Sequence, residues 1–443
     1  MNIILLSGGA GKRLWPLSNK IRSKQFLKIY KLDDGTYESM VQRVYRQIKS
    51  IDSRANITIA TSRSQVSAIL NQLGGKVNLS VEPCRRDTFP AIALAVSYLH
   101  NVIGIDKEDS VSVCPVDHFV EDRYYKVVEQ LGTEALKGYA ELVLMGIRPT
   151  YASDKYGYII PRGKEKIDWV EEFKEKPDVI TAKSYISKGA LWNAGVFSFK
   201  MKYVLDTAES IFGTCDYNDL ISRYHKLEMI SFDYAVVEKA KAVKVIRYDG
   251  QWLDVGSWPA LSQTMAEATM GKVYTDDRCT DYHVINDLEI PILCLGLNRL
   301  MVAASPDGIL IANSDNCDQI KEYVDNIKQK VMYAEKSWGV FHVLDVGDNC
   351  LTVKVTMKAK NHMKYHSHDR RDEVWTVVFG KGKTIVDGIE QYVAPGDVIT
   401  IQAGCKHTIF SITELVLIEV QLGVDINVSD KHKHEMPYFY KDW

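Results

Sequence analysis

The fold of the first half of the chain is decided by residues 3–18, which read Ile3-Ile4-Leu5-Leu6-Ser7-Gly8-Gly9-Ala10-Gly11-Lys12-Arg13-Leu14-Trp15-Pro16-Leu17-Ser18. A short apolar strand that ends in a glycine loop presents free backbone N–H groups that can surround a phosphate. Basic side chains follow closely, at Lys12, Arg13 and Lys24. The pattern predicts a nucleotide site at the end of a buried strand.

Spacing excludes two common phosphate-binding loops. A P-loop places a Lys-Ser/Thr pair after its last glycine, whereas Gly11 is followed by Lys12 and Arg13. The dinucleotide-binding fingerprint needs a third glycine at the position that Leu14 occupies. The glycine loop therefore belongs to a different class of nucleotide site.

Length and composition restrict the possible partners. A chain of 443 residues is longer than a single hydrophobic core usually supports, so we expect two or three domains. The formal net charge of -2 gives no reason to expect a nucleic-acid or membrane partner. No stretch approaches the ~20 apolar residues of a membrane span. Local cations must therefore hold any anionic ligand.

Cysteine usage and the chain start point to the cytoplasm. The eight cysteines never approach a Cys-x-x-Cys spacing, which predicts neither a zinc ribbon nor a disulfide framework. The apolar run after Met1 and Asn2 is too short for the apolar region of a signal peptide. We expect a protein of the reducing cytoplasm.

The character of the sequence changes twice along the chain. Over residues 1–262, short apolar runs (3–6, 57–60, 111–114) alternate with helix-compatible segments (40–51, 66–73), which predicts an α/β domain with a mostly parallel sheet. Residues 263–330 read as a β-rich connector that ends in a helix and has no chemistry of its own. Residues 331–443 contain many short strands at close spacing, which predicts an all-β barrel or sandwich.

The string Gly-Gly-x-Gly-x-Arg-Leu-x-Pro-Leu, with Lys-Gln-Phe close behind, resembles the N-terminal signature of sugar-1-phosphate nucleotidyltransferases. Residues 13–18 are most similar to the bacterial mannose-1-phosphate guanylyltransferase branch. Ser23 stands where that family usually has a proline before the Lys-Gln-Phe. The resemblance implies a Rossmann-like nucleotidyltransferase domain. It also implies nucleotide binding by Gly8, Gly9, Gly11, Lys12 and Arg13.

Nucleotidyl transfer requires strong charge cancellation, because a sugar phosphate must approach a triphosphate. Two like unit charges about 4 Å apart repel by ~4 kcal/mol at an effective dielectric constant of about 20. Cations and oriented N–H groups must offset this repulsion in the transition state. Arg13 and Lys24 are suited to this, since a guanidinium grips two phosphate oxygens and an ammonium follows developing charge.

Two predicted strand ends each deliver a carboxylate. Asp117 lies at the end of the segment 111–118, just before His118, and Asp254 lies within the segment 252–258. Mg²⁺ prefers one or two carboxylates together with phosphate oxygens, although an aspartate at a strand end can also be a helix cap. Both segments resemble strings of the guanylyltransferase branch, and the resemblance implies that Asp117 and Asp254 hold Mg²⁺.

Further strings resemble the substrate-binding segments of the same family. Phe-x-Glu-Lys-Pro at 173–177 implies that Lys176 neutralises the attacking phosphate and that Glu175 accepts from sugar hydroxyls. Gly157, Asn193 and residues 233–239 lie in three other sugar-binding strings.

The nucleobase segment is expected at residues 82–91, where the resemblance implies roles for Glu82 and Arg86. Asp87 replaces an asparagine of the family pattern there, which removes a donor and adds charge. GTP and mannose 1-phosphate are the expected substrates, and another base or hexose 1-phosphate stays open.

The third region resembles the two cupin motifs through His366, His368, Glu373 and His407. His366 and His368 share one face of a strand, whereas Glu373 lies an odd number of residues onward, so residues 369–372 must bulge or turn. Three imidazoles and a carboxylate suit a divalent transition metal, either Zn²⁺, Mn²⁺, Fe²⁺ or Ni²⁺. His362 is a competing ligand candidate. His432 and His434 are expected in a solvated tail.

In the bifunctional guanylyltransferase family this barrel is a mannose-6-phosphate isomerase. The segments 336–339 and 418–423 resemble its entrance and its last strand, but the usual Tyr-Gly-Arg does not follow Gly423. Three readings stay open: a Mg²⁺-dependent transferase that makes GDP-mannose, a bifunctional enzyme that also interconverts fructose 6-phosphate and mannose 6-phosphate, or a transferase with a non-catalytic barrel for binding or dimerisation. A homodimer is expected.

Overall fold

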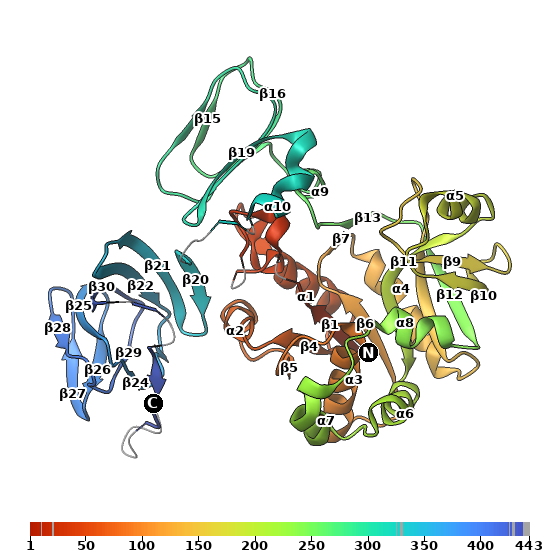
Figure 1. The fold of residues 1–443 in the computed structure, drawn as a ribbon, viewed down its shortest axis with the longest axis horizontal. Coiled ribbons are helices and arrows are strands. Elements are labelled where there is room, and N and C mark those ends of the chain that lie inside the picture. The colour runs from red at the N-terminus through yellow and green to blue at the C-terminus, as the bar shows by residue number, and fades with distance from the viewer. Residues whose placement is uncertain are drawn as a thin grey trace. The chain divides into compact units, whose positions relative to one another are not determined.

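The computed structural model describes residues 1–9, 11–19, 22–324, 326–327, 331–424, 426–427 and 430–436, without the side chains of Lys12 and Asp318 (Figure 1). The chain divides into two compact units. The first comprises Met1–Gly11, Ser23–Val66 and Leu73–Ala266, and the second comprises Lys12–Arg22, Ser67–Gln72 and Glu267–Trp443. The domain boundaries expected at residues 262 and 330 stay predictions.

A nine-stranded sheet forms the centre of the first unit, in the order β5-β4-β1-β6-β11-β8-β12-β10-β9. The strands are β1 (Asn2–Ser7), β4 (Asn56–Ser62), β5 (Asn78–Glu82), β6 (Ser110–Pro115), β8 (Leu142–Ile147), β9 (Tyr158–Pro161), β10 (Ile167–Lys174), β11 (Leu191–Lys200) and β12 (Val243–Tyr248). Only β10 and β11 run against the others within this sheet. The predicted mostly parallel α/β fold is confirmed.

Helices cover both faces of this sheet. They are α1 (Met40–Ile51), α3 (Thr88–Tyr98), α4 (Arg123–Leu136), α5 (Val179–Ser187), α6 (Met201–Phe212), α7 (Tyr217–Arg223), α8 (Phe232–Ala235) and α9 (Trp258–Ser262), and α2 (Val66–Leu73) is shared between the units. Two short pairings complete the first unit, β2 (Lys28–Lys31) with β3 (Tyr37–Ser39) and β7 (His118–Val120) with β13 (Trp252–Asp254). None of the helices within the described ranges is long and apolar enough to cross a membrane.

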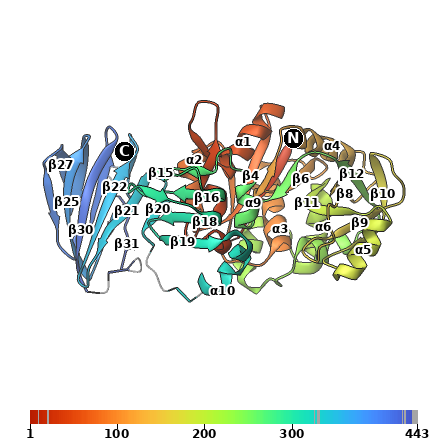
Figure 2. The ribbon, with the colours of Figure 1, turned by 90° about the horizontal axis from the view of Figure 1, so that it is seen from above.

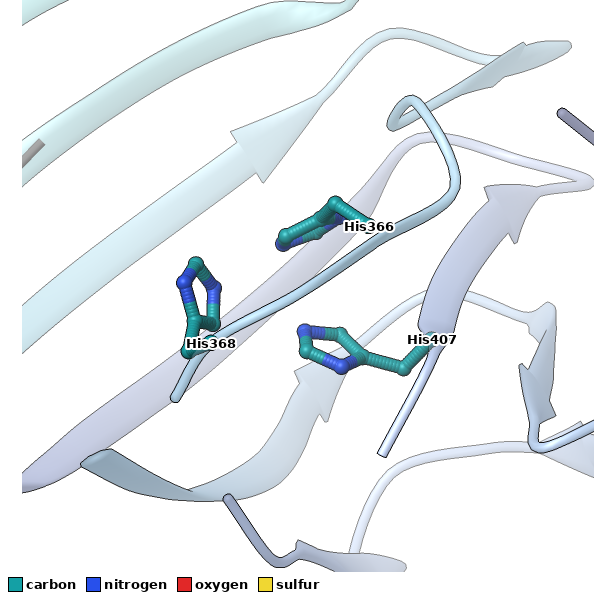
Figure 3. Close-up of side chains that lie close together, drawn as sticks. All are labelled: His366, His368 and His407. Carbon is teal, nitrogen blue, oxygen red and sulfur yellow. The ribbon is translucent and has the colours of Figure 1, made fainter. Parts of the chain in front are cut away.

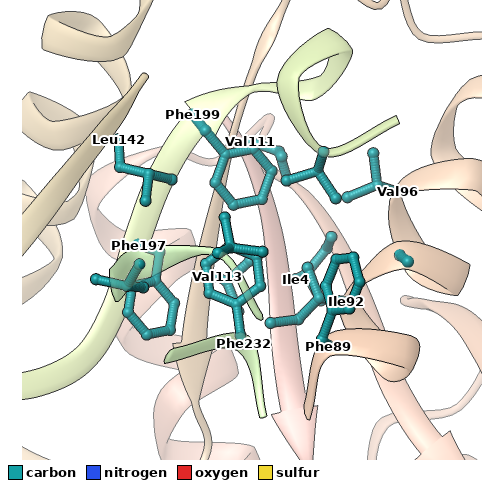
Figure 4. Close-up of a cluster of buried hydrophobic side chains, with 14 of the residues drawn as sticks. Ile4, Phe89, Ile92, Val96, Val111, Val113, Leu142, Phe197, Phe199 and Phe232 are labelled. Carbon is teal, nitrogen blue, oxygen red and sulfur yellow. The ribbon is translucent and has the colours of Figure 1, made fainter. Parts of the chain in front are cut away.

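The side chains of β6 show how the sheet separates its two faces. Val111 and Val113 pack in the core with Phe89 of α3 and Phe232 of α8 (Figure 4). Ser112 points the other way, where its hydroxyl lies next to Gly132 of α4. Successive residues of a strand face opposite sides of a sheet, so this alternation fixes which helix covers which face.

The chain reverses its direction of travel across the sheet at β1. From β1 it passes to β4 and β5 on one side, and β6 then adds on the other side of β1. Ligands of open α/β sheets bind beyond the carboxyl ends of the strands at such a point. The glycine loop follows β1 and Asp117 follows β6, and Val116 N donates to the Leu6 carbonyl over 3.2 Å. Sheet topology therefore brings the two segments together.

The second unit contains a short parallel β-solenoid. Strands β14 (Thr269–Met270), β16 (Thr280–Asn286) and β18 (Asn298–Ser305) stack in parallel, as do β15 (Val273–Thr275) and β17 (Ile292–Cys294), and β19 (Gly308–Asn313) closes the stack antiparallel. A 3₁₀ segment and α10 (Ile320–Val324) follow. The β-rich character expected of this segment is thus seen, and residues 325 and 328–330 of the expected helix lie outside the described part.

The C-terminal region forms an all-β barrel of two sheets, which agrees with the predicted fold class (Figure 2). One sheet has the order β20-β21-β22-β30-β25-β28, with β20 (Tyr333–Lys336), β21 (Gly339–Val346), β22 (Cys350–Met357), β25 (Arg371–Phe379), β28 (Val398–Ile401) and β30 (Leu415–Gly423). The other contains β23 (Asn361–His362), β24 (His366–Ser367), β26 (Gly382–Val386), β27 (Ile389–Val393), β29 (His407–Ser411) and β31 (His432–Lys433). Trp375 and Leu417 lie in the core between them.

The segment that carries His432 and His434 pairs with another strand and is therefore not the free tail that we expected. β31 pairs with β24, which places His432 opposite Ser367. The His434 ring lies 2.9 Å from the Ser367 hydroxyl. His432 is exposed, as expected, but the pairing was missed because strand pairing between distant segments leaves no signal in so short a stretch.

Candidate functional site

Lys24 lies beside both predicted magnesium carboxylates. Its Nζ is 2.8 Å from Asp117 Oδ2 and 3.9 Å from Asp254 Oδ1, and it donates to the Val255 carbonyl over 3.0 Å. The pairing of β13 with β7 creates this arrangement, because it sets Asp254 opposite His118. Three residues that are far apart in the sequence therefore meet at one point.

The charges at this point suit a divalent cation. Burial raises the pKa of Asp117, but attraction to Lys24 and to His118, together with hydrogen bonds, outweighs burial and holds that pKa below its ordinary value. Both carboxylates keep part of their surface open, 31% for Asp117 and 39% for Asp254. Two carboxylates that still reach solvent are the donor set that Mg²⁺ takes together with phosphate oxygens. The residues present fit this ion.

The glycine loop adopts a backbone that requires glycine. Gly9 has φ +98° and Gly11 has φ +62°, in the left-handed region that other residues rarely adopt. Gly8 has open space around its Cα, so a ligand can approach the backbone there. The Lys12 side chain lies outside the described residues. Arg13 is exposed and belongs to the segment Lys12–Arg22 of the second unit, so its role stays a prediction.

A buried polar network supports the start of this loop. Gln65 donates through Nε2 to Ser23 Oγ over 2.8 Å and accepts from Ser7 Oγ over 3.3 Å. Gln25 Nε2 donates to the same Ser7 hydroxyl over 3.0 Å. The network explains why serine can stand at position 23 in place of the proline of the family pattern, since the Ser23 hydroxyl accepts the hydrogen bond from Gln65. Gln65 carried no signal in the sequence.

The expected nucleobase residues lie at the same edge of the sheet. Glu82 ends β5 and pairs in register with Ser62 of β4. Its carboxylate accepts from Tyr224 Oη over 2.8 Å, and burial raises its pKa. Arg86 donates to the His225 carbonyl. The roles of Glu82 and Arg86 in base recognition stay predictions.

Gly157 and Glu175 form the tightest contact of the expected sugar site. A Cβ at position 157 would lie 2.4 Å from Glu175 Oε2, so only glycine leaves room for this carboxylate. Glu175 is buried; its Oε1 accepts from Lys176 Nζ over 2.6 Å. Glu175 Oε2 is buried and has no hydrogen-bond partner among the described residues. A buried carboxylate oxygen without a partner is ready to accept a ligand hydroxyl.

Asn193 joins this cluster and introduces a residue that we did not select. Its Nδ2 donates to Asp233 Oδ1 over 2.8 Å, and its backbone N donates to the Gly157 carbonyl over 2.8 Å. Burial, and then the Glu175 charge, raise the pKa of Asp233 to about 7. Asp233 lay within a string that we quoted, but nothing in its local sequence distinguished it from its neighbours.

A row of aromatic rings connects the sugar cluster with the two aspartates. The Trp192 ring centroid lies 4.8 Å from that of Tyr156 and 6.3 Å from that of Trp252. The Trp252 ring in turn lies 4.9 Å from the ring of His118. Asn193 follows Trp192 in β11, and Asp254 lies two residues after Trp252 in β13, so the ring contacts link the two strands that carry these polar side chains.

The barrel brings three imidazoles together, as Figure 3 shows. One ring nitrogen of each of His366, His368 and His407 lies within 4.8 Å of the others. The Nδ1 atoms lie against the carbonyls of Lys364 (2.6 Å), Asp430 and Cys405 (2.9 Å), in the same order. A carbonyl can only accept, so we assign the proton to Nδ1, which leaves each Nε2 lone pair available for a metal.

Glu373 completes the predicted donor set. The chain bends at residues 369–370 between β24 and β25. This bend was expected because Glu373 lies an odd number of residues after His368. Glu373 Oε1 then lies 3.1 Å from His368 Nε2, and Oε2 lies 3.4 Å from His407 Nε2. Burial lowers the pKa of His366 to about 2, which keeps this imidazole neutral at pH 7. These donors fit a divalent transition metal. His362 is exposed and outside the cluster.

Two further polar residues face the barrel interior and escaped the sequence analysis. Arg371 donates through Nε to Glu373 Oε1 over 3.0 Å and approaches His368 Nε2 at 3.0 Å. Glu419 is buried, and burial followed by the Glu373 charge raises its pKa to about 8. Both residues occupy buried positions in the alternation of their strands, and this pattern did not distinguish them from core positions.

Comparison with known proteins agrees with this geometry. Residues 2–270 match the family model described as nucleotidyl transferase, and residues 324–435 match that of the mannose-6-phosphate isomerase C-terminal domain. The mannose-1-phosphate guanylyltransferase of Salmonella muenchen is 31% identical over 96% of each chain. That of Salmonella typhimurium is 30% identical over 99% of this chain and 98% of its own.

A solved structure is similar as well. The crystal structure of a protein from Thermus thermophilus, described as a mannose-1-phosphate geranyltransferase, is 28% identical, with a TM-score of 0.61 over 73% of this chain and 98% of its own. The predicted resemblance is therefore confirmed. The chain belongs to the nucleotidyl transferase family, in the branch of the mannose-1-phosphate guanylyltransferases that carry a C-terminal mannose-6-phosphate isomerase domain.

Proposed function

We propose that this protein makes GDP-mannose from GTP and mannose 1-phosphate. An oxygen of the sugar phosphate attacks the α-phosphorus in line, a new P–O bond forms, the bond to the β-phosphate breaks, and pyrophosphate leaves. No covalent enzyme intermediate is needed, so positioning and charge cancellation supply the rate. The observation that carries the proposal is the meeting of Lys24, Asp117 and Asp254 beside the glycine loop's sheet edge.

The nucleotide is assigned to the carboxyl edge around β1. The N–H groups of Gly8, Gly9 and Gly11, with Lys12 and Arg13, hold the triphosphate, while Glu82 and Arg86 contact the base. Asp117 and Asp254 would hold Mg²⁺, which when bound neutralises charge on the phosphate oxygens. Lys24 lies against the same carboxylates and is placed to follow charge onto the departing pyrophosphate.

The sugar phosphate is assigned to the second cluster. Glu175 Oε2 accepts from a sugar hydroxyl, Asn193 and Asp233 form a second polar edge, and Gly157 allows close approach. Lys176 is half-exposed and can turn from Glu175 to the attacking phosphate. The aromatic row between Trp192 and Trp252 leads from this cluster to Asp254.

Substitution of Asp254 tests the magnesium assignment. In Asp254→Asn, one carboxylate charge is lost, and we expect kcat for pyrophosphate release to fall about 100-fold or more, with a higher Mg²⁺ requirement. The matched control is Asp249→Asn, an exposed aspartate in the loop before β13. Full pyrophosphate release by Asp254→Asn with every nucleoside triphosphate tested would contradict the assignment.

Substitution of Glu175 tests the sugar site. Glu175→Gln keeps the shape but replaces one acceptor oxygen with a donor, so we expect the KM for mannose 1-phosphate to rise about tenfold. The KM for GTP should stay within about twofold. Glu171→Gln, at an exposed position of β10, which ends one residue before Glu175, is the control. An equal rise in both KM values would argue against a sugar contact.

The raised pKa of Asp233 predicts a pH-dependent stability. Between its ordinary value near 4 and about 7, the folded protein holds a proton that the unfolded chain has lost. This contribution to stability is present below pH 4 and is lost as the pH rises through about 7. We expect the Tm of the wild type to fall more than that of Asp233→Asn between pH 5 and pH 8. Parallel curves would contradict the shift.

A second activity, the interconversion of fructose 6-phosphate and mannose 6-phosphate, is favoured by the barrel interior. His366, His368, His407 and Glu373 would hold Zn²⁺, Mn²⁺, Fe²⁺ or Ni²⁺, which when bound polarises sugar oxygens. Glu419 is buried beside this group with a raised pKa, so it is suited to hold a proton during the reaction. A non-catalytic barrel remains the competing reading.

Metal content and activity of full-length variants decide between a catalytic and a non-catalytic barrel. We expect about one transition metal per chain by elemental analysis, and its loss in His407→Gln but not in His362→Gln. The same His407 variant should lose isomerisation and keep pyrophosphate release, because the two reactions use different residues. A metal-loaded wild type without isomerisation would leave the barrel a binding or dimerisation module.

The remaining proposals concern assembly and compartment. Edge strands β27 and β28 expose the apolar residues Ile389, Tyr392 and Val398, which supports a homodimer formed through the barrel. Sedimentation equilibrium measures the mass of the assembly and tests this. All eight cysteines are free thiols, which supports a place in the reducing cytoplasm.

A further inference from the structure

The segment that carries Arg13 is held by the β-solenoid, a region for which the sequence predicted no chemistry. Both belong to the second compact unit. Within Lys12–Arg22, Leu14 and Leu17 are buried, with exposures of 1% and 2%, while Arg13 remains exposed. The Arg13 side chain therefore points to solvent from a segment that is anchored by buried residues. Its position depends on the contacts that hold those buried residues.

The turn between β18 and β19 provides three contacts to this segment. Ser305 Oγ donates to the Pro16 carbonyl over 2.8 Å. Asn19 Nδ2 donates to Asp307 Oδ2 over 2.5 Å. Gly308, with φ +147°, lies against the Trp15 ring so closely that a Cβ there would be 2.5 Å from Cζ2.

Asp307 is the residue through which these contacts are linked. It is buried, with an exposure of 6%, and its backbone N donates to Ser305 Oγ over 3.1 Å. Its Oδ2 accepts from Asn19, and its Oδ1 accepts from the backbone N of Met332 over 2.9 Å. A single carboxylate thus ties the Arg13 segment to the residue just before β20, the first barrel strand.

The end of the segment is fixed in the same way. Arg22 forms an ion pair with Asp287 of the solenoid, with 2.6 Å between Nη1 and Oδ2. Its guanidinium also lies over the Tyr333 ring, 4.8 Å from the centroid. The solenoid and the residues that enter the barrel therefore contact the segment at Trp15, Pro16 and Asn19 and again at Arg22.

We propose that Asp307 is a positioning residue for nucleotide binding: by holding Asn19 it fixes the Arg13 segment, and by holding Met332 it makes that position depend on the barrel. The inference rests on the proposed function, because it takes Arg13 as a triphosphate ligand. It assigns a role to the solenoid turn that neither the sugar cluster nor the barrel metal site involves.

The contact between Asn19 and Asp307 permits a swap experiment. Asp307→Asn alone turns an amide donor toward the Asn19 amide, and Asn19→Asp alone sets two carboxylates face to face. The double variant restores one donor and one acceptor, in reversed order. The carboxylate that Asn19→Asp introduces would still accept from Arg22 N, which now donates to Asn19 Oδ1 over 2.7 Å.

We expect each single variant to raise the KM for GTP about tenfold, with the KM for mannose 1-phosphate unchanged, and the double variant to recover to within about threefold. Hydrogen exchange of residues 13–19 should be faster in the single variants and near the wild-type rate in the double variant. The control is Asp315→Asn, which breaks the exposed 2.7 Å pair with Arg299 in the same solenoid. It should change neither measurement.

The outcome separates this inference from the proposed function. Single variants that lower the Tm without raising the KM for GTP, or a swap that fails to recover, would overturn the positioning role. If the wild type transfers no nucleotidyl group, calorimetric binding of GTP still decides: weaker binding in Asp307→Asn supports the inference while the proposed function fails. A wild type that binds no nucleoside triphosphate would overturn both.

Discussion

Electrostatic repulsion between two phosphorylated substrates is the constraint around which the transferase half is organised. The chain answers it with Lys24, Asp117 and Asp254, gathered at the carboxyl edge of one sheet. None of these groups would serve alone, because an isolated carboxylate repels phosphate and an isolated ammonium cannot hold a metal. Their proximity depends on β13 pairing with β7, so a short two-stranded ribbon is as important to the site as the large sheet.

The barrel also gathers polar side chains at one point, but there they are three histidines and a glutamate. Three histidines are buried and are oriented by backbone carbonyls at Nδ1, so that their second nitrogens face a common point. Glu373 arrives from the other side of a bend in the chain. In both sites the backbone fixes the side chains before any ligand binds, which reduces the ordering that binding would otherwise require.

The solenoid holds the Arg13 segment and the entrance to the barrel through few but buried contacts. Asp307 has both carboxylate oxygens satisfied by segments that are far apart in the sequence, and loss of either partner would leave a buried polar group unpaired. The Arg13 segment is accordingly part of the second compact unit although its neighbours in sequence belong to the first.

The sequence by itself determined the α/β class, the glycine loop, the barrel and the histidine cluster, because each depends on short-range periodicity or spacing. Alternation along a strand was enough to place His366 beside His368 and to require the bend before Glu373. Tertiary structure alone decided that Lys24 faces both aspartates, that Asp233 joins Glu175, that Gln65 supports the loop, and that Asp307 holds Asn19. Each of these contacts joins segments separated by many residues, and a local pattern carries no information about which distant segment will fold against it.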